Sequence, residues 1–274
     1  MTPPAPGLLL DRIETAVFDL DGTVYLGDAL LPGAHRTIHA LRDSGKRTVF
    51  CSNNPTKTAA EYAEKLTRLG VPTDPADVVT SLTATVRWIQ DNAAGAKVFA
   101  IGEAPLESAL TEAGIELSDD PEQIDVVIAS YDRAFDYRKL QIAFDALWFH
   151  KRSRLVATNP DRFCPFPGGR GEPDAASVIA AIEACAQVRC EAVFGKPERG
   201  LLDIMISLTG LRPESTVMLG DRLATDIRFA NRGGMTSALV LTGETDRALL
   251  ARNGADDPPD VVLDRIDELL TVRG

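Results

Sequence analysis

Short apolar runs recur along the chain, and each ends at polar or charged residues. Residues 15–18 precede Asp19, residues 47–51 precede Ser52, and residues 216–219 precede Gly220 and Asp221. Runs of small, β-branched and aromatic residues that do not alternate with polar ones are typical of strands covered on both faces. Segments with helical patterns separate the runs, so the pattern predicts a Rossmann-like, doubly wound parallel sheet of the α/β class.

A second series of strand and helix patterns begins near residue 83. Strands are expected at 97–102, 125–130 and 154–159, with a helix over 137–150 between the last two. We therefore predict two domains: a core made of 1–82 and 191–274, and an inserted α/β domain over 83–190. The Pro- and Gly-rich segment 159–171 is expected to be an irregular loop, of a length usually kept for function.

Asp19 and Asp21 follow the first run directly and lie two residues apart. Ligands of open parallel sheets bind just beyond the carboxyl ends of the strands. Two carboxylates held side by side there are costly unless a cation or a proton relieves their repulsion. This stretch therefore predicts a bound metal, an acid/base pair, or both.

Three other segments carry candidate chemistry. Ser52-Asn53-Asn54 ends a strand before a helix, which suits an anion held by a hydroxyl and backbone N–H groups. Lys196 stands between a glycine and a proline and can present a fixed positive charge. Asp221 and Asp226 follow another strand, which favours ligation of a hard cation by oxygen.

Composition narrows the partners. The formal net charge is -11 and the pI is about 4.8, which disfavours binding to a nucleic acid polymer or an anionic membrane. The four cysteines are scattered and form no C-x-x-C pair, so reduced thiols are expected rather than a zinc site or a disulfide framework. Residues 1–10 contain no basic residue and too short an apolar run for a signal peptide, so we predict a cytoplasmic protein.

Together these segments resemble the haloacid dehalogenase (HAD) superfamily. Asp19-Leu20-Asp21-Gly22-Thr23 is similar to its first motif, Ser52 stands at the second, Gly195-Lys196-Pro197 resembles the third, and Gly220-Asp221 with Asp226 resembles the fourth. The resemblance extends from about residue 13 to 270. An insertion between the second and third motifs is similar to the cap domain of the type IIA, NagD-like branch, which includes 4-nitrophenyl phosphatases.

This resemblance implies a Mg²⁺-dependent phosphatase with an inserted α/β cap of the type IIA class that governs specificity. Asp19 would be the nucleophile that forms an aspartyl-phosphate, and Asp21 the general acid and base. The remaining roles fall into two groups: metal ligands Asp19, Asp21 through its backbone carbonyl, Asp221 and Asp226; and phosphate-binding residues Gly22, Ser52, Asn53, Asn54 and Lys196. Ser52 and Lys196 also count as catalytic residues, because they position the phosphoryl oxygens and offset their charge.

The expected substrate is a small phosphorylated metabolite: a sugar phosphate, glycerol phosphate, phosphoglycolate, nucleotide or pyridoxal phosphate. Family analogy also suggests a homodimer through the cap. Relatives often carry a small, glycine-containing stretch after the proline of the cap loop, whereas this chain reads Pro173-Asp174-Ala175-Ala176-Ser177. A carboxylate at Asp174 can alter the substrate pocket, so the sequence assigns no individual substrate.

Three alternatives remain. A phosphotransferase or phosphomutase would use the same Asp19 intermediate, but the large cap disfavours it. A dehalogenase is disfavoured because such relatives lack an Asp at the position of Asp21. A non-catalytic module that binds a phosphorylated metabolite is disfavoured because every motif residue is present.

Overall fold

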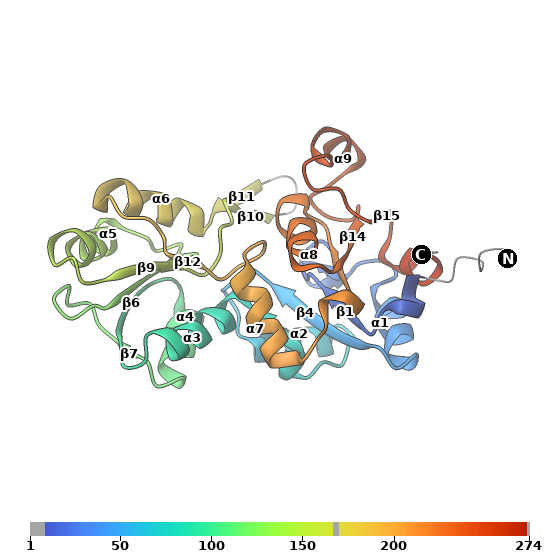
Figure 1. Cartoon of the computed structure of the whole chain (residues 1–274), viewed down its shortest axis with the longest axis horizontal. Coiled ribbons are helices and arrows are strands. Elements are labelled where there is room, and N and C mark those ends of the chain that lie inside the picture. Colours follow the sequence, from blue (N-terminus) through green and yellow to red (C-terminus); the bar gives the residue numbers. More distant parts are fainter. Residues whose placement is uncertain (1–8, 167–169, 273–274) are drawn as a thin grey trace. The chain divides into compact units, whose positions relative to one another are not determined.

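The computed structural model describes residues 9–166 and 170–272, which form two compact units (Figure 1). The first unit takes in the chain up to Ser52, then Ala60–Val79, and the chain from Met205 onward; the second comprises Asn53–Ala59 and Thr80–Ile204. The chain passes between units after residues 52, 59, 79 and 204, whereas the sequence places the domain boundaries at 82/83 and 190/191. The role of the inserted segment as a specificity cap stays a prediction.

The first unit is built on a six-stranded sheet with the order β15-β14-β13-β1-β4-β5. β1 pairs in parallel with β13 on one side and with β4 on the other. The strands are β1 (Thr15–Phe18), β4 (Arg47–Ser52), β5 (Val78–Thr80), β13 (Thr216–Gly220), β14 (Thr236–Val240) and β15 (Val261–Leu263). The order runs outward in opposite directions from β1 and β13, which confirms the doubly wound topology and makes their junction the switch point where ligands bind.

Helices and short turns complete the first unit. The α-helices are α1 (Ala34–Asp43), α2 (Ala59–Arg68), α8 (Arg228–Gly233) and α9 (Arg247–Asn253). The shorter elements are η1 (Leu9–Arg12), η2 (Pro75–Asp77), η4 (Pro213–Ser215), η5 (Leu223–Ile227), η6 (Ile266–Thr271) and a small hairpin of β2 (Tyr25–Leu26) with β3 (Ala29–Leu30). In α1 the buried positions are Ala34, Thr37, Ile38 and Leu41, the i, i+3, i+4, i+7 spacing of a helix packed on one face.

The second unit has its own parallel sheet, with the order β12-β9-β8-β6-β7. Its strands are β6 (Lys97–Ile101), β7 (Glu116–Leu117), β8 (Val126–Ala129), β9 (Arg154–Ala157) and β12 (Ala192–Val193). Figure 1 shows α5 and α6 on one side of this sheet and α3 and α4 on the other. The helices are α3 (Ser81–Asn92), α4 (Ala104–Glu112), α5 (Tyr137–Phe144), η3 (Asp145–Phe149), α6 (Ala175–Ala186) and α7 (Arg199–Thr209), which continues into the first unit.

One buried cluster holds the second unit together. Phe99, Val127 and Leu155 of the sheet pack against Ala143 of α5 and Ile182 of α6. These are the apolar positions of the strand and helix patterns in the sequence. A parallel sheet with helices packed on it confirms the α/β class of the inserted region.

The Pro- and Gly-rich segment differs from its prediction as an irregular loop. β10 (Phe163–Phe166) and β11 (Arg170–Pro173) form an antiparallel pair, and residues 167–169 lie outside the described chain. Gly171 suits this close pairing, because a Cβ there would lie 2.9 Å from the Cys164 carbonyl oxygen. The sequence hid the pair because prolines usually interrupt strands, and here they stand in a two-stranded ribbon outside the main sheets.

Asp174, whose role the sequence leaves open, is a helix cap. It is buried, and its carboxylate accepts a hydrogen bond from the Ala175 N–H at the start of α6 (2.5 Å). Among the described residues, no helix combines the length and apolar character needed to cross a membrane. Residues 1–8, most of the segment read for a signal peptide, lie outside the described chain.

Candidate active site

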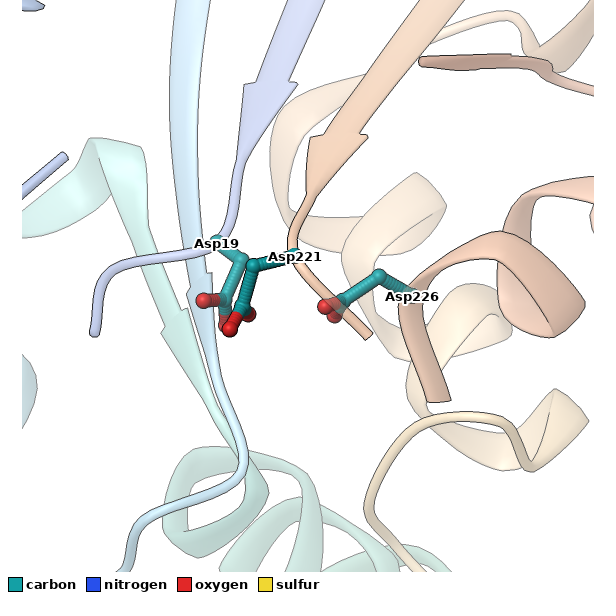
Figure 2. A group of neighbouring side chains, drawn as sticks. All are labelled: Asp19, Asp221 and Asp226. Carbon is teal, nitrogen blue, oxygen red and sulfur yellow. The ribbon is translucent and has the colours of Figure 1, made fainter. Parts of the chain in front are cut away.

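Three carboxylates converge at the switch point of the first unit (Figure 2). Asp19 follows β1, Asp221 follows β13, and Asp226 lies on η5. One oxygen of each lies within 4.8 Å of the others, and Asp221 and Asp226 are almost fully buried. Two of the three therefore come from residues more than 200 positions away from the first.

Strand register produces this convergence. Phe18 of β1 stands beside Leu219 of β13, and the Asp19 N–H continues the ladder by donating to the Leu219 carbonyl (2.8 Å). Because both strands run in the same direction, the residues that follow them emerge at the same edge of the sheet. Asp226 is brought back by η5, where its carboxylate accepts from the Arg222 N–H (3.1 Å).

Asp221 is held by a loop after β14. The Glu244 N–H donates to Asp221 Oδ2 (2.6 Å), and the Thr245 N–H donates to the Asp221 carbonyl (3.1 Å). Glycines make room for the carboxylate: a Cβ at Gly243 would lie 2.0 Å from Asp221 Oδ2, and one at Gly22 would lie 2.6 Å from it. The 242–245 segment is a part of the site that the sequence did not predict, and Gly243, three residues after the end of β14, is its only signal in the sequence.

The carboxylate cluster suits a hard cation. Burial raises the pKa of Asp221 well above its ordinary value, and the charges of Asp19 and Asp226 raise it further. Asp221 Oδ1 is buried and has no hydrogen-bond partner among the described residues. A buried carboxylate oxygen that accepts no hydrogen bond is costly unless a cation binds it. Together with the two neighbouring carboxylates it offers the oxygen ligands that Mg²⁺ prefers.

Asp21 and Gly22 begin the turn after β1. Asp21 is exposed and is not one of the three clustered carboxylates, so only its backbone carbonyl is a candidate ligand. The Gly22 N–H donates to the Tyr25 carbonyl (2.9 Å), and Gly22 has a φ of 86°, which favours glycine. The turn therefore keeps the Asp21 side chain outside the buried cluster.

Tyr25 is a second feature that the sequence did not reveal. Its side chain is fully buried, its hydroxyl has no hydrogen-bond partner among the described residues, and Lys65 Nζ lies 3.7 Å from the ring centroid. Burial, followed by the charge of Asp21, raises the pKa of Tyr25, so the phenol stays neutral at physiological pH.

The remaining predicted residues divide between the units. Ser52 ends β4 in the first unit and is buried. Asn53, Asn54 and Lys196 belong to the second unit, where Asn53 binds the backbone of Lys196. Lys196 is almost fully buried, unlike an ordinary surface lysine.

Comparison with known proteins places these features in a family. Residues 16–116 match the model of the haloacid dehalogenase-like hydrolases, and residues 193–269 match a second HAD-like hydrolase model. The chain is 34% identical to the sugar-phosphatase AraL of Bacillus subtilis, over 98% of this chain and 93% of that protein. It is 33% identical to the human glycerol-3-phosphate phosphatase, over 96% of this chain and 91% of that protein.

Solved structures agree with the sequence relatives. The 4-nitrophenylphosphatase of Thermotoga maritima is 35% identical and superposes with a TM-score of 0.89, covering 96% of this chain and 98% of that one. NagD from E. coli is 26% identical with a TM-score of 0.81, covering 93% of this chain and 98% of that one. The motifs, the topology and these relatives together show that the chain belongs to the haloacid dehalogenase-like hydrolases, as a phosphatase of the NagD and 4-nitrophenylphosphatase branch.

Proposed function

We propose that this phosphatase hydrolyses small phosphate monoesters with Mg²⁺ as cofactor, through an aspartyl-phosphate on Asp19. The observation that carries the proposal is the buried cluster of Asp19, Asp221 and Asp226 at the switch point of the sheet. Asp19 is the least buried of the three, which leaves its carboxylate accessible to a substrate. The relatives named as sugar, glycerol-3-phosphate and 4-nitrophenyl phosphatases support the same reaction class.

Hydrolysis then takes two displacements at phosphorus. A carboxylate oxygen of Asp19 bonds to phosphorus while the ester P–O bond breaks, and Asp21 gives its proton to the departing alkoxide oxygen. In the second step Asp21 takes a proton from water, the water oxygen bonds to phosphorus, and the bond to Asp19 breaks to release phosphate. The exposure of Asp21 supports this role, because it must exchange protons with both the leaving group and water.

The ligands proposed for Mg²⁺ are Asp19, the Asp21 backbone carbonyl, Asp221 and Asp226. When bound, the ion supplies positive charge that offsets the repulsion between the Asp19 carboxylate and an anionic phosphate ester. The Glu244 N–H keeps Asp221 Oδ2 in place and leaves Oδ1 for the ion.

Phosphoryl oxygens are proposed to accept hydrogen bonds from the Ser52 hydroxyl and the backbone N–H groups of Asn53 and Asn54. The Gly22 N–H, also predicted to bind them, would have to leave the Tyr25 carbonyl to which it donates (2.9 Å). Lys196 offsets the charge of the phosphoryl oxygens. Fixed donors and charges of this kind act on the negative charge of the transferring phosphoryl group and supply much of the rate acceleration.

The second unit is proposed to act as the cap that contacts the leaving group and excludes water. The substrate is then a small phosphorylated metabolite, and the candidates are sugar phosphates, glycerol phosphate, phosphoglycolate, nucleotides and pyridoxal phosphate. Names of relatives support the first three classes.

A cytoplasmic location and a homodimer through the second unit are further proposals. The four cysteines all lie in the described part of the chain and form no disulfide there, which suits a reducing compartment. Tyr137 and Phe149 of the second unit expose 78% and 74% of their surface, and a second copy can cover such exposed aromatic side chains. Light scattering tests the dimer, and a monomer at micromolar concentration would contradict it.

The deciding experiment measures phosphate release from 4-nitrophenyl phosphate and from one ester of each candidate class. The reactions contain Mg²⁺ or a chelator, with Asp19→Asn as the inactive variant. We expect Mg²⁺-dependent release that the substitution lowers by at least about 10⁴-fold. Release equal to that of Asp19→Asn, from a folded protein, would refute hydrolysis, and transfer to a sugar hydroxyl acceptor would then identify a phosphotransferase.

A further inference from the structure

The side chain of Asn53 binds both the backbone N–H and the backbone carbonyl of Lys196. Its Oδ1 accepts a hydrogen bond from the Lys196 N–H (2.6 Å), and its Nδ2 donates to the Lys196 carbonyl (2.9 Å). These partners settle the orientation of the amide, because a backbone N–H can only donate and a backbone carbonyl can only accept. Asn53 and Lys196 are 7% and 1% exposed, so water competes little for these bonds.

Other contacts hold Asn53 itself in place. Its Nδ2 also donates to the Asp161 carboxylate (3.2 and 3.3 Å), and its backbone carbonyl accepts from Ser81 Oγ at the start of α3 (2.7 Å). The two amide hydrogens therefore point to the Lys196 carbonyl and to Asp161. Asp161 precedes β10, so one asparagine connects the lysine loop with the approach to the β10–β11 pair.

Packing at Gly195 keeps the same loop close to Asn53. A Cβ at Gly195 would lie 2.8 Å from Asn159 Cβ and 3.0 Å from Asn53 Oδ1. The backbone before Lys196 therefore passes too close to its neighbours for any larger residue. Hydrogen bonds and packing therefore both restrict the position of the Lys196 backbone, from which the side chain extends.

We propose that Asn53 is a positioning residue for Lys196: its side-chain amide fixes the lysine backbone, and Asp161 fixes the amide. This inference rests on the proposed function, in which Lys196 offsets phosphoryl charge. It assigns the Asn53 side chain to Lys196, and leaves the backbone N–H of Asn53 as the group that binds phosphate. Because lysine has a long, flexible stem, a fixed backbone confines the region that its ammonium group reaches.

A double-mutant cycle tests the proposal. Asn53→Ala, Lys196→Ala and the double variant are compared by kcat and KM for the best ester in the panel. Misplacing a group by about 1 Å can cost about 100-fold, so we expect Asn53→Ala to lower kcat/KM by about 10- to 100-fold. In the Lys196→Ala background Asn53→Ala should lower kcat/KM by less than about twofold, because the lysine ammonium group that Asn53 positions is already absent.

Two further variants separate positioning from general damage. Ser130→Ala also removes one buried side-chain hydrogen bond from the second unit, that with Thr158 Oγ1 (2.8 Å), and should leave kcat/KM unchanged. Asp161→Ala removes the contact with Asn53 Nδ2 and keeps both bonds from Asn53 to the Lys196 backbone, so it should lower kcat/KM less than Asn53→Ala and, again, only when Lys196 is present. It also serves as the test if Asn53→Ala does not fold.

The backbone amide resonance of Lys196 gives a readout that is independent of turnover. Loss of the bond to Asn53 Oδ1 should move the Lys196 amide proton upfield in Asn53→Ala and leave the resonances of β8 unchanged. The role of Asn53 would be overturned if the loss of kcat/KM in the double variant equalled the product of the two single losses, or if the Lys196 amide resonance did not move. No turnover in the unmodified protein would instead overturn the proposed function on which that role rests.

Discussion

The two units each contain a charged centre, and the two centres are built in opposite ways. In the first unit Asp19, Asp221 and Asp226 bring like charges together, and one buried oxygen of Asp221 has no hydrogen-bond partner among the described residues. In the second unit the peptide of the buried Lys196 is hydrogen-bonded on both its N–H and its carbonyl side. The carboxylate cluster gathers charge that a cation would offset, whereas the chain itself supplies the hydrogen bonds to the Lys196 backbone.

Under the proposed function, this difference separates two ways of preparing groups that bind a phosphate ester. The cluster carries electrostatic strain that a bound cation relieves, so its stability and its activity should both respond to Mg²⁺. The Lys196 backbone is held by its hydrogen bonds with the Asn53 amide and by packing at Gly195, so its order should not depend on a ligand. Changes in the two centres should therefore have different signatures.

The largest difference is expected for Asp221→Asn. Loss of one metal ligand should lower Mg²⁺-dependent kcat/KM by about 10³-fold, since the ion supplies several kcal/mol of charge stabilisation. The same variant should unfold about 2–4 °C higher than the unmodified protein in chelator, because it removes about 1 kcal/mol or more of buried charge repulsion. Thermal unfolding with and without Mg²⁺ measures both effects.

The pH dependence of that stability gain has a defined sign. The pKa of Asp221 is raised in the folded protein, so the folded state prefers the protonated acid and loses this stabilisation as pH rises above 3.8, the ordinary value, through the folded pKa. The advantage of Asp221→Asn in chelator should therefore grow as pH rises. An advantage that shrinks with rising pH would show that Asp221 is stabilised as a carboxylate.

Lys196→Met should lower kcat/KM by about 10²- to 10³-fold, the range for loss of one group that stabilises developing charge. Unlike Asp221→Asn, it should leave the Mg²⁺ dependence of unfolding unchanged. Lys97→Met, at a lysine paired with Glu116 on the surface of the same unit (2.9 Å), is the matched control with no expected kinetic effect. A changed response of Tm to Mg²⁺ in Lys196→Met would contradict the separation of the two centres.

Gly243→Ala should weaken Mg²⁺ affinity by about 10- to 100-fold, the range for changes that disturb the orientation of a metal ligand. The added methyl group would lie 2.0 Å from Asp221 Oδ2, so the carboxylate must move. Gly200→Ala in α7 is the control, because its Cβ meets Phe194 Cδ1 at 3.6 Å, an ordinary contact. Titration of the activity with Mg²⁺ measures the difference. Equal affinities in the two variants would show that the residues around the Asp221 carboxylate adapt to the added methyl group.

The smallest effect is expected at Glu103, which is not a residue of either centre. Arg133 donates two hydrogen bonds to Glu103 (2.6 and 2.7 Å), and these bonds are the main reason that the pKa of Glu103 is lowered. Glu103→Gln should cost about 0.5 kcal/mol at neutral pH with no change in kcat/KM. A lowered pKa stabilises the fold above the ordinary value of 4.5 and loses that effect as pH falls, so the cost should disappear in acid.

Much of the fold follows from local patterns. The apolar runs of β1, β4 and β13 and the helical spacing in α1 are properties of short segments. Such patterns favour the same secondary structure in most folds. The β10–β11 pair was missed because its pairing overrides the local preference of prolines. The short edge strand β7, with two exposed residues, has no apolar run to announce it.

The sequence also singled out Asp19, Asp221 and Asp226, which the structure brings together, whereas the roles of Asp21, Ser52 and Lys196 stay predictions. The partners of these residues could not be predicted. Glu244 supports Asp221 through a backbone N–H, and any residue except proline supplies that group. The bond from Asn53 to Lys196 joins positions 143 residues apart, and no spacing rule predicts it.

Residue types and local periodicity are enough to establish the α/β class, the order of the motifs and the kinds of chemical group at each strand end. Which of these groups meet depends on the folded chain: strand register brings Asp19 to Asp221, and a long-range amide contact holds the Lys196 backbone. The physical reason is that charge repulsion, burial and hydrogen bonding depend on distances in space, which the order of residues does not contain.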